Sequence, residues 1–159
     1  MFHGSLSRKR VCDGLPPHPL RVLCVDDNRD SADSTALLLG LCGYDAVACY
    51  DGPSGLAEAA RVPPDACLLD LNMPGMDGDE LAVRIRDRVP DRRIVFVALT
   101  AQVGESATER IRRAGFRHHL IKPVAPDALL AALQPLDDKP LAPHEVIPRA
   151  HDDVRRTGR

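Results

Sequence analysis

Five polar residues follow apolar runs in this sequence, and their side chains suit phosphoryl chemistry. They are three carboxylates, one hydroxyl and one ammonium: Asp26, Asp27, Asp70, Thr100 and Lys122. Neighbouring carboxylates repel one another, and a hard cation such as Mg²⁺ relieves that repulsion. A carboxylate can attack phosphorus while an ammonium and a hydroxyl offset charge on the phosphoryl oxygens. Each member of the set therefore has a use if the chemistry is metal-assisted transfer of a phosphoryl group to an aspartate.

Asp70 is the expected nucleophile. It ends the apolar part of LLDLNMPGMDG, residues 68–78, and the loop behind it leaves its carboxylate open to a partner. Asp27 and Asp70 are the expected direct ligands of Mg²⁺, and the backbone carbonyl of Asn72 is the simplest third oxygen. Thr100 is expected to donate a hydrogen bond to a phosphoryl oxygen, and Lys122 to offset its charge.

Alternating strands and helices must bring these side chains together. Apolar runs predict strands at residues 21–26, 44–50, 65–70, 94–99 and 118–121. Helical spacing, prolines and capping pairs predict helices at residues 28–41, 53–61, 77–89, 106–115 and 126–133. Such an alternation implies a three-layer α/β domain with a parallel sheet and right-handed crossovers. Its strands would place their carboxyl ends, and thus the polar set, in one crevice.

Local patterns predict several details of these helices. Asp77 with Glu80 and Ser106 with Glu109 have the spacing of helix-capping pairs. The first and third helices are expected to bury the following apolar residues: Ala32, Ala36, Leu37, Leu39, Leu41, Leu81, Val83, Ile85 and Val89.

Length and composition limit the classes of protein. The 159 residues suffice for one domain, expected at residues 20–134, with a flexible leader at 1–19 and a mostly disordered tail at 135–159. A net charge of -2 argues against binding nucleic acid or a membrane through bulk charge. No apolar run approaches the roughly 20 residues of a membrane span, and no secretory signal is present, so we expect a cytoplasmic protein. The five cysteines form no CxxC pair, which predicts buried, reduced thiols.

The ordered motifs resemble the receiver domain of two-component response regulators over about residues 21–133. They are Asp26-Asp27, Asp70 in LLDLNMPGMDG, Leu99-Thr100-Ala101 and Ile121-Lys122-Pro123. The resemblance implies a flavodoxin-like fold of five βα units with sheet order 2-1-3-4-5. It also implies that Asp70 accepts a phosphoryl group from a histidine kinase or a histidine phosphotransfer protein. Asp26 and Asp27 would belong to the Mg²⁺ site, and Thr100 and Lys122 would sense the phosphoryl group. Such a domain is no enzyme beyond catalysing its own phosphorylation and dephosphorylation.

The resemblance implies a switch as well. The residue three before the lysine is usually an aromatic that rotates, and here it is His119, which is more polar. A phosphoryl group on Asp70 would attract Thr100 and Lys122 and change the surface of the fourth helix, fifth strand and fifth helix. We expect output through this surface. The last helix is apolar on several sides, which a homodimer, another partner or burial by the tail would each explain.

Two other functions remain open. A metal-dependent phosphatase of the haloacid dehalogenase type requires a D-x-D motif after the first strand, whereas Asp26 and Asp27 are adjacent. A degenerate receiver would act only as a protein interaction module, although all the phosphorylation residues are present. Without a DNA-binding or enzymatic output domain in the sequence, we expect a single-domain regulator. It would act by protein contact, by phosphoryl relay or as a phosphate sink.

Overall fold

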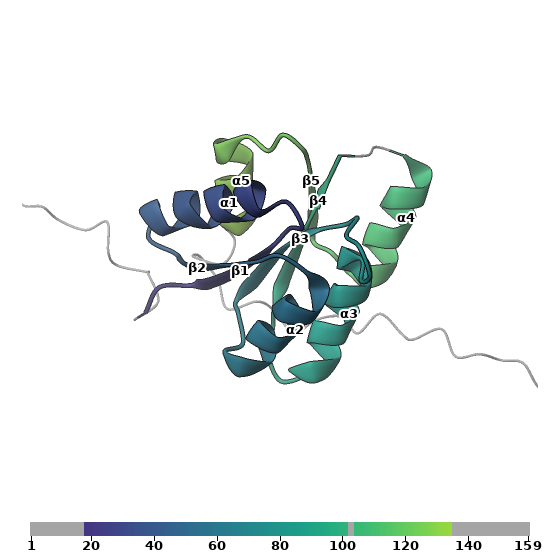
Figure 1. Ribbon diagram of the computed structural model, residues 1–159, viewed down its shortest axis with the longest axis horizontal. Helices are drawn as coiled ribbons and strands as arrows, with labels where there is room; N and C mark the ends of the chain where they lie inside the picture. Colours follow the sequence, from purple (N-terminus) through teal and green to yellow (C-terminus); the bar gives the residue numbers. More distant parts are fainter. Residues whose placement is uncertain (1–17, 102–103, 135–159) are drawn as a thin grey trace, which may run out of the picture.

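The computed structural model describes residues 18–101 and 104–134 (Figure 1). Most of the predicted leader, the whole predicted tail and Cys12 lie outside these residues. Among the described helices, none has the length and apolar character that crossing a membrane requires.

Five parallel strands form one sheet in the order β2-β1-β3-β4-β5. The strands are β1 (Arg21–Val25), β2 (Asp45–Cys49), β3 (Ala66–Asp70), β4 (Val95–Thr100) and β5 (His118–Ile121). Every residue of β3 and β4 is buried, because both have a neighbouring strand on each side and helices above and below. The structure thus confirms the predicted flavodoxin-like topology.

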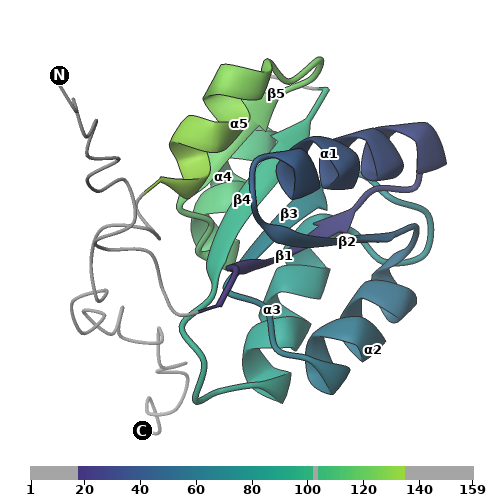
Figure 2. The same ribbon diagram turned by 90° about the vertical axis from the view of Figure 1, so that its left-hand side faces the viewer.

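Five helices cover the two faces of the sheet. They are α1 (Arg29–Leu41), α2 (Gly52–Arg61), α3 (Gly78–Arg88), α4 (Glu105–Ala114) and α5 (Pro126–Leu133). Helices α1 and α5 lie on one face, and α2, α3 and α4 lie on the other (Figures 1 and 2). Leu39 and Leu133 belong to the core on the first face, and Leu81 and Phe96 to the core on the second. These two layers hold the carboxyl ends of the strands in fixed positions.

Side chains cap the first two helices, Asn28 at α1 and Asp51 at α2, whereas the two predicted capping pairs do not form as expected. Asn28 caps α1, its side chain accepting a hydrogen bond from the Ser31 amide. The predicted Ser106 capping pair is wrong, because α4 begins at Glu105 after Gly104. Asp77 does precede α3, but its carboxylate accepts a hydrogen bond from the Met73 amide, within the preceding loop, at 3.3 Å.

Three apolar side chains of the predicted buried faces are exposed instead. Leu37 is 66% exposed, Leu41 81% and Val83 42%. A helix resting on a sheet buries one stripe, and in α1 that stripe contains Ala32 and Leu39. The prediction for the cysteines holds for Cys24, Cys49 and Cys67 but is wrong for Cys42, which is exposed just after α1. The apolar pattern therefore overestimates what α1 and α3 bury.

Candidate functional site

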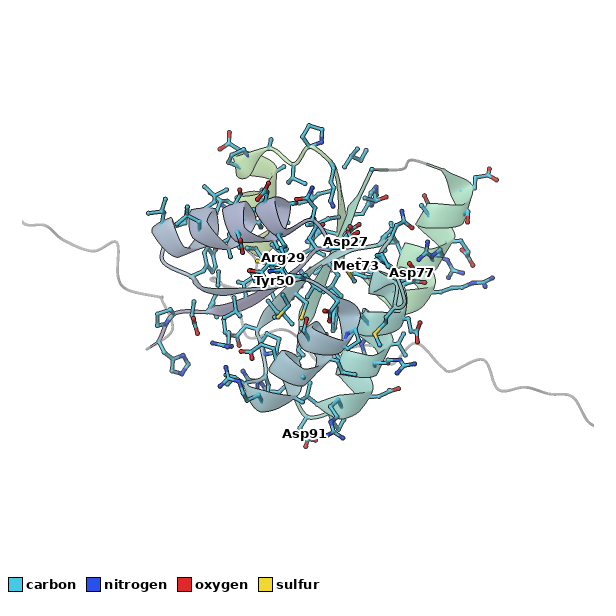
Figure 3. All side chains as sticks on the ribbon, in the orientation of Figure 1. Asp27, Arg29, Tyr50, Met73, Asp77 and Asp91 are labelled. Atoms are coloured by element: carbon cyan, nitrogen blue, oxygen red, sulfur yellow. The ribbon has the colours of Figure 1, made fainter. Side chains whose placement is uncertain are left out.

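Three carboxylates meet at the carboxyl edge of the sheet. Asp26 and Asp27 directly follow β1, and Asp70 is the last residue of β3, the neighbouring strand. One oxygen from each lies within 4.8 Å of the others. Asp26 and Asp70 are buried, whereas Asp27 is exposed at the rim and is labelled near the centre of Figure 3. The cluster thus combines buried negative charge with one solvent-facing carboxylate.

Lys122 joins this cluster from the other end of the domain sequence. It directly follows β5, and its Nζ lies 2.7 Å from Oδ2 of Asp26 and 3.2 Å from Oδ2 of Asp70. Its backbone amide donates to the carbonyl of Thr100 at 2.8 Å, which fixes the chain at this point. Although burial lowers the pKa of Lys122, the two carboxylates raise it above its usual value. The ammonium is therefore a permanent positive charge between two carboxylates.

Asp26 is held by a set of hydrogen bonds. Oδ2 accepts from Ser31 Oγ at 2.7 Å and from Lys122 at 2.7 Å, while Oδ1 accepts from the Asn28 amide at 3.0 Å. Burial raises the pKa of Asp26, but these hydrogen bonds outweigh it and lower the pKa below its usual range. Sequence reasoning missed Ser31. Its position on the first turn of α1, five residues after Asp26, is the signal that identifies it.

Asp70 has a different electrostatic environment. Burial raises its pKa to about 6, and the positive charge of Lys122 and a hydrogen bond from the Asn72 amide oppose that rise. The Asn72 amide donates to Oδ1 at 3.2 Å. Two neighbouring carboxyls thus have pKa values moved in opposite directions, a pattern common at functional sites. Asp70 is the more basic of the two, as suits a nucleophile.

The loop after Asp70 packs closely against the strand it leaves. A Cβ atom on Gly78 would lie 2.2 Å from the Asp70 carbonyl oxygen, so only glycine fits there. The Gly78 amide donates to the Leu71 carbonyl at 3.1 Å, and Met73 and Met76 are buried beneath the loop. This packing sets the path of the chain through Asn72, whose backbone carbonyl is the predicted ligand.

Thr100 and His119, the predicted switch residues, lie on the last two strands. Thr100 is buried at the end of β4, where it pairs in register with Ile121 of β5. His119 is on β5 opposite Ala98, and its side chain is exposed. The sheet therefore brings Thr100 to the same edge as Asp70, while His119 lies two positions before the end of β5.

An aromatic contact missed by sequence reasoning borders the site. The Arg29 guanidinium carbon lies 4.3 Å from the centre of the Tyr50 ring, and the Tyr50 hydroxyl donates to Asp33 at 2.7 Å. Figure 3 labels Arg29 and Tyr50 side by side, near Asp27. This contact joins the start of α1 to the end of β2. Its sequence signal is weak, since Arg29 and Tyr50 are 21 positions apart in the chain.

Arg110 of α4 is a further residue near the site that sequence reasoning missed. Its guanidinium contacts the loop after Asp70 through the side chain of Asn72 and the carbonyl of Leu71. No local pattern predicts such a contact, because Arg110 and Asn72 are 38 positions apart. The arrangement as a whole can bind a hard cation and place an ammonium beside a small anionic group at Asp70.

Comparison with known proteins agrees with this geometry. Residues 22–134 match the family described as the response regulator receiver domain. The chain is 37% identical over 119 residues to the response regulator MprA of Mycobacterium leprae, covering 74% of this chain and 50% of MprA. It is 34% identical over 116 residues to the response regulator PleD of Caulobacter vibrioides, covering 73% of this chain and 26% of PleD. The chain therefore spans half or less of the length of these relatives.

Solved structures show the same relationship. The Vibrio cholerae chemotaxis protein CheY4 has a TM-score of 0.69 at 28% identity, covering 74% of this chain and 98% of CheY4. A CheY-like receiver domain protein from Methanospirillum hungatei has a TM-score of 0.68 at 26% identity, covering 74% and 93% of the two chains. The family match, the strand order and the acidic edge of the sheet lead to one conclusion: this chain belongs to the response regulator receiver domain family.

Proposed function

We propose that this chain is a phosphoacceptor response regulator that receives a phosphoryl group on Asp70. The donor would be a phosphohistidine of a histidine kinase or of a histidine phosphotransfer protein. The observation that supports this most directly is the position of Lys122, whose Nζ lies 2.7 Å from Asp26 and 3.2 Å from Asp70. An ammonium beside the nucleophile can offset the charge of a transferred phosphoryl group.

Mg²⁺ suits the donor set at this edge of the sheet. Three carboxylates with oxygens within 4.8 Å of one another carry more negative charge than Lys122 neutralises, and oxygen is the ligand that Mg²⁺ prefers. Asp26, Asp27, Asp70 and the backbone carbonyl of Asn72 would hold the ion. When bound, Mg²⁺ supplies positive charge that stabilises the phosphoryl oxygens during transfer.

The transfer itself makes and breaks one bond. A carboxylate oxygen of Asp70 forms a bond to phosphorus, the bond between phosphorus and the donor imidazole nitrogen breaks, and its electron pair stays on that nitrogen. Lys122 offsets charge on one phosphoryl oxygen, and Thr100 donates a hydrogen bond to another. Asp26, whose pKa is low, stays ionised throughout. The chain thus contributes positioning and electrostatics, which dominate catalysis of phosphoryl transfer.

Phosphorylation would then change the surface formed by α4, β5 and α5. Thr100 and Lys122 follow β4 and β5, so their attraction to a new dianion moves the segments that lead into α4 and α5. Within the described residues, this surface includes His119 and the half-exposed Ile121 on β5. We propose it for signalling by protein contact in the cytoplasm, either with another protein or in a homodimer.

The test is to incubate the purified chain with Mg²⁺ and acetyl phosphate and to measure its intact mass. We expect the mass of one phosphoryl group to be added, and Asp70→Asn to abolish the addition. Asp91→Asn is the matched control, because Asp91 is exposed and lies far from Asp27 in Figure 3. A chain that gains no mass while another receiver domain does so under the same conditions would instead be a degenerate receiver that acts as an interaction module.

A further inference from the structure

Arg110 of α4 contacts the two residues that follow Asp70. Its Nη1 donates to Asn72 Oδ1 at 3.1 Å, and its Nη2 donates to the Leu71 carbonyl oxygen at 3.2 Å. Leu71 is fully buried and Asn72 is exposed, so the guanidinium reaches from the surface to the base of the loop. A side chain of the fourth helix therefore contacts both the side chain and the backbone of the loop after the third strand.

The guanidinium is itself firmly held. Its Nε donates to Asp79 Oδ2 at 3.1 Å, its Nη2 donates to Asp79 Oδ1, and Nη2 also lies 3.1 Å from Asp77 Oδ2. A two-point contact with a carboxylate fixes the plane of an arginine, which a lysine cannot reproduce. Because two carboxylates surround one positive charge, this cluster does not repel a cation at the neighbouring site.

A single peptide unit connects Arg110 to Asp70. The Leu71 carbonyl accepts hydrogen bonds from Arg110 and from the Gly78 amide, and the amide of the same unit, that of Asn72, donates to Asp70 Oδ1 at 3.2 Å. Because a peptide unit is planar, holding its carbonyl also fixes the direction of its N–H. The orientation of the Asp70 carboxylate thus depends on Arg110 through one rigid group.

Arg86 contacts the C-terminal end of the same helix. Its Nη2 donates to the carbonyl of Ala114 at 2.9 Å, and its guanidinium lies 4.8 Å from the centre of the Phe96 ring. Helix α4 is therefore attached to α3 and to the core near its C-terminal end as well as to the loop after Asp70. Because this second contact holds α4 against α3 and the core, the backbone of Arg110 is fixed relative to the loop that its side chain contacts.

We propose that Arg110 is a positioning residue for the cation site. It fixes the Leu71–Asn72 peptide unit and, through it, the Asp70 carboxylate, and its hydrogen bond to Asn72 Oδ1 holds the residue whose carbonyl is the predicted ligand. The part of this proposal that concerns the cation rests on the proposed function. Because α4 carries Arg110, a displacement of α4 also changes the affinity of the site for Mg²⁺. By thermodynamic linkage, Mg²⁺ binding stabilises the position of α4 seen here.

The first experiment measures Mg²⁺ affinity by isothermal titration calorimetry. Arg110→Gln and Arg110→Lys are each expected to weaken Mg²⁺ binding about tenfold, as is usual when a residue that orients a metal ligand is lost. Arg112→Gln is the matched control, because Arg112 is on the same helix and pairs with Glu109 at the surface. An Arg110→Lys variant that binds Mg²⁺ like the wild type would overturn the proposal, since charge alone would then suffice.

The second experiment uses no metal. Amide hydrogen exchange followed by NMR in EDTA is expected to show about tenfold faster exchange at Asn72 in Arg110→Gln than in the wild type, with no change at Asn72 in Arg112→Gln. An unchanged rate at Asn72 in Arg110→Gln would overturn the proposal. If Arg110→Gln does not fold, Asp79→Asn gives the same test, because it removes the two-point contact that fixes Arg110 and leaves Asn72 intact.

The two experiments also separate this inference from the proposed function. A wild-type chain that fails to bind Mg²⁺ contradicts the proposed function, and the exchange rate of the Asn72 amide then decides the positioning role alone. In the opposite case, the wild-type chain binds Mg²⁺ and forms the phosphorylated product, as the proposed function requires. If the Arg110→Gln variant then does both equally well, the result contradicts the positioning role alone.

Discussion

Lys122 donates a hydrogen bond of 2.7 Å to Asp26, a residue 96 positions earlier in the chain. Its ammonium is also 3.2 Å from the Asp70 carboxylate, so one positive charge compensates two buried negative charges. Removing the ammonium leaves both carboxylates buried without compensation, which costs more than the net value of the ion pair. The stability of the domain without metal should therefore depend strongly on Lys122.

Lys122→Ala is expected to destabilise the metal-free protein by about 3 kcal/mol. Urea unfolding in EDTA measures this loss, and saturating Mg²⁺ is expected to reduce it, because the cation supplies the missing positive charge. Arg84→Ala is the matched control: Arg84 pairs with Glu80 at an exposed i,i+4 position, so its loss should cost no more than about 0.5 kcal/mol. Equal losses for the two variants would contradict this expectation.

Asp70→Asn is expected to stabilise the metal-free protein near neutral pH. The folded-state pKa of Asp70 is about 6, above its usual 3.8, so ionisation of Asp70 destabilises the folded chain as pH rises from about 4 to 6. A shift of about two pKa units corresponds to at most about 3 kcal/mol, and partial access of solvent reduces the effect to about 1 kcal/mol.

The advantage of Asp70→Asn should therefore be complete above about pH 6 and disappear as pH falls toward 4. Urea unfolding at several pH values in EDTA measures it. Asp91→Asn removes an exposed carboxylate near the other end of the sheet and reports the general effect of losing one charge. An advantage that stays constant between pH 7 and pH 4 would show that burial of the ionised carboxylate is not the cause.

Gly78→Ala and Gly75→Ala are expected to differ sharply in stability although both change the loop after Asp70. The new Cβ at position 78 would lie 2.2 Å from the Asp70 carbonyl oxygen, so the backbone must move, at a cost of about 3 kcal/mol. At Gly75, φ is +81° and no atom lies within 4 Å of the new Cβ, so only backbone strain of about 1 kcal/mol remains. Thermal unfolding compares the two, and a larger loss for Gly75→Ala would contradict the packing described here.

Thiol reactivity should separate Cys42 from the three buried cysteines. Burial raises the pKa of Cys24 to about 12, and it also raises the pKa values of Cys49 and Cys67. In a Cys12→Ser background, a thiol reagent should therefore modify one cysteine quickly and the other three only after unfolding. Adding Cys42→Ser should remove the fast phase. A fast phase that survives this substitution would mean that a buried thiol is accessible.

The strand ends could be predicted from the sequence, because a parallel sheet covered on both faces requires continuous apolar runs. The run before Asp70 and the run before Thr100 both become strands buried at every position, with the polar residue last. Once those ends are known, the topology brings them to one edge of the sheet. The acidic cluster of Asp26, Asp27 and Asp70 follows from that geometry alone.

The contacts of Arg110 could not be predicted in this way. Local spacing identifies residues that meet on one helix, but Arg110 meets Asn72 across 38 positions and Asp79 across 31. The wrong capping prediction at Ser106 has a local cause: the spacing to Glu109 fits a capping pair, but α4 already starts at Glu105, so Ser106 lies inside the helix. Glu109 instead pairs with Arg112 and Arg113 on its own helix.

The position of β5 at one edge of the sheet has a consequence for folding. Among the described strands it is the last in sequence and pairs with β4 alone, yet it leads directly to Lys122. If the other four strands assembled first, Asp26 and Asp70 would lie close together without the ammonium of Lys122, and their repulsion would raise the free energy of that partly folded state. Electrostatic repulsion should thus make folding more cooperative, and the Asp70 carboxylate reaches its final environment only when the whole sheet is complete.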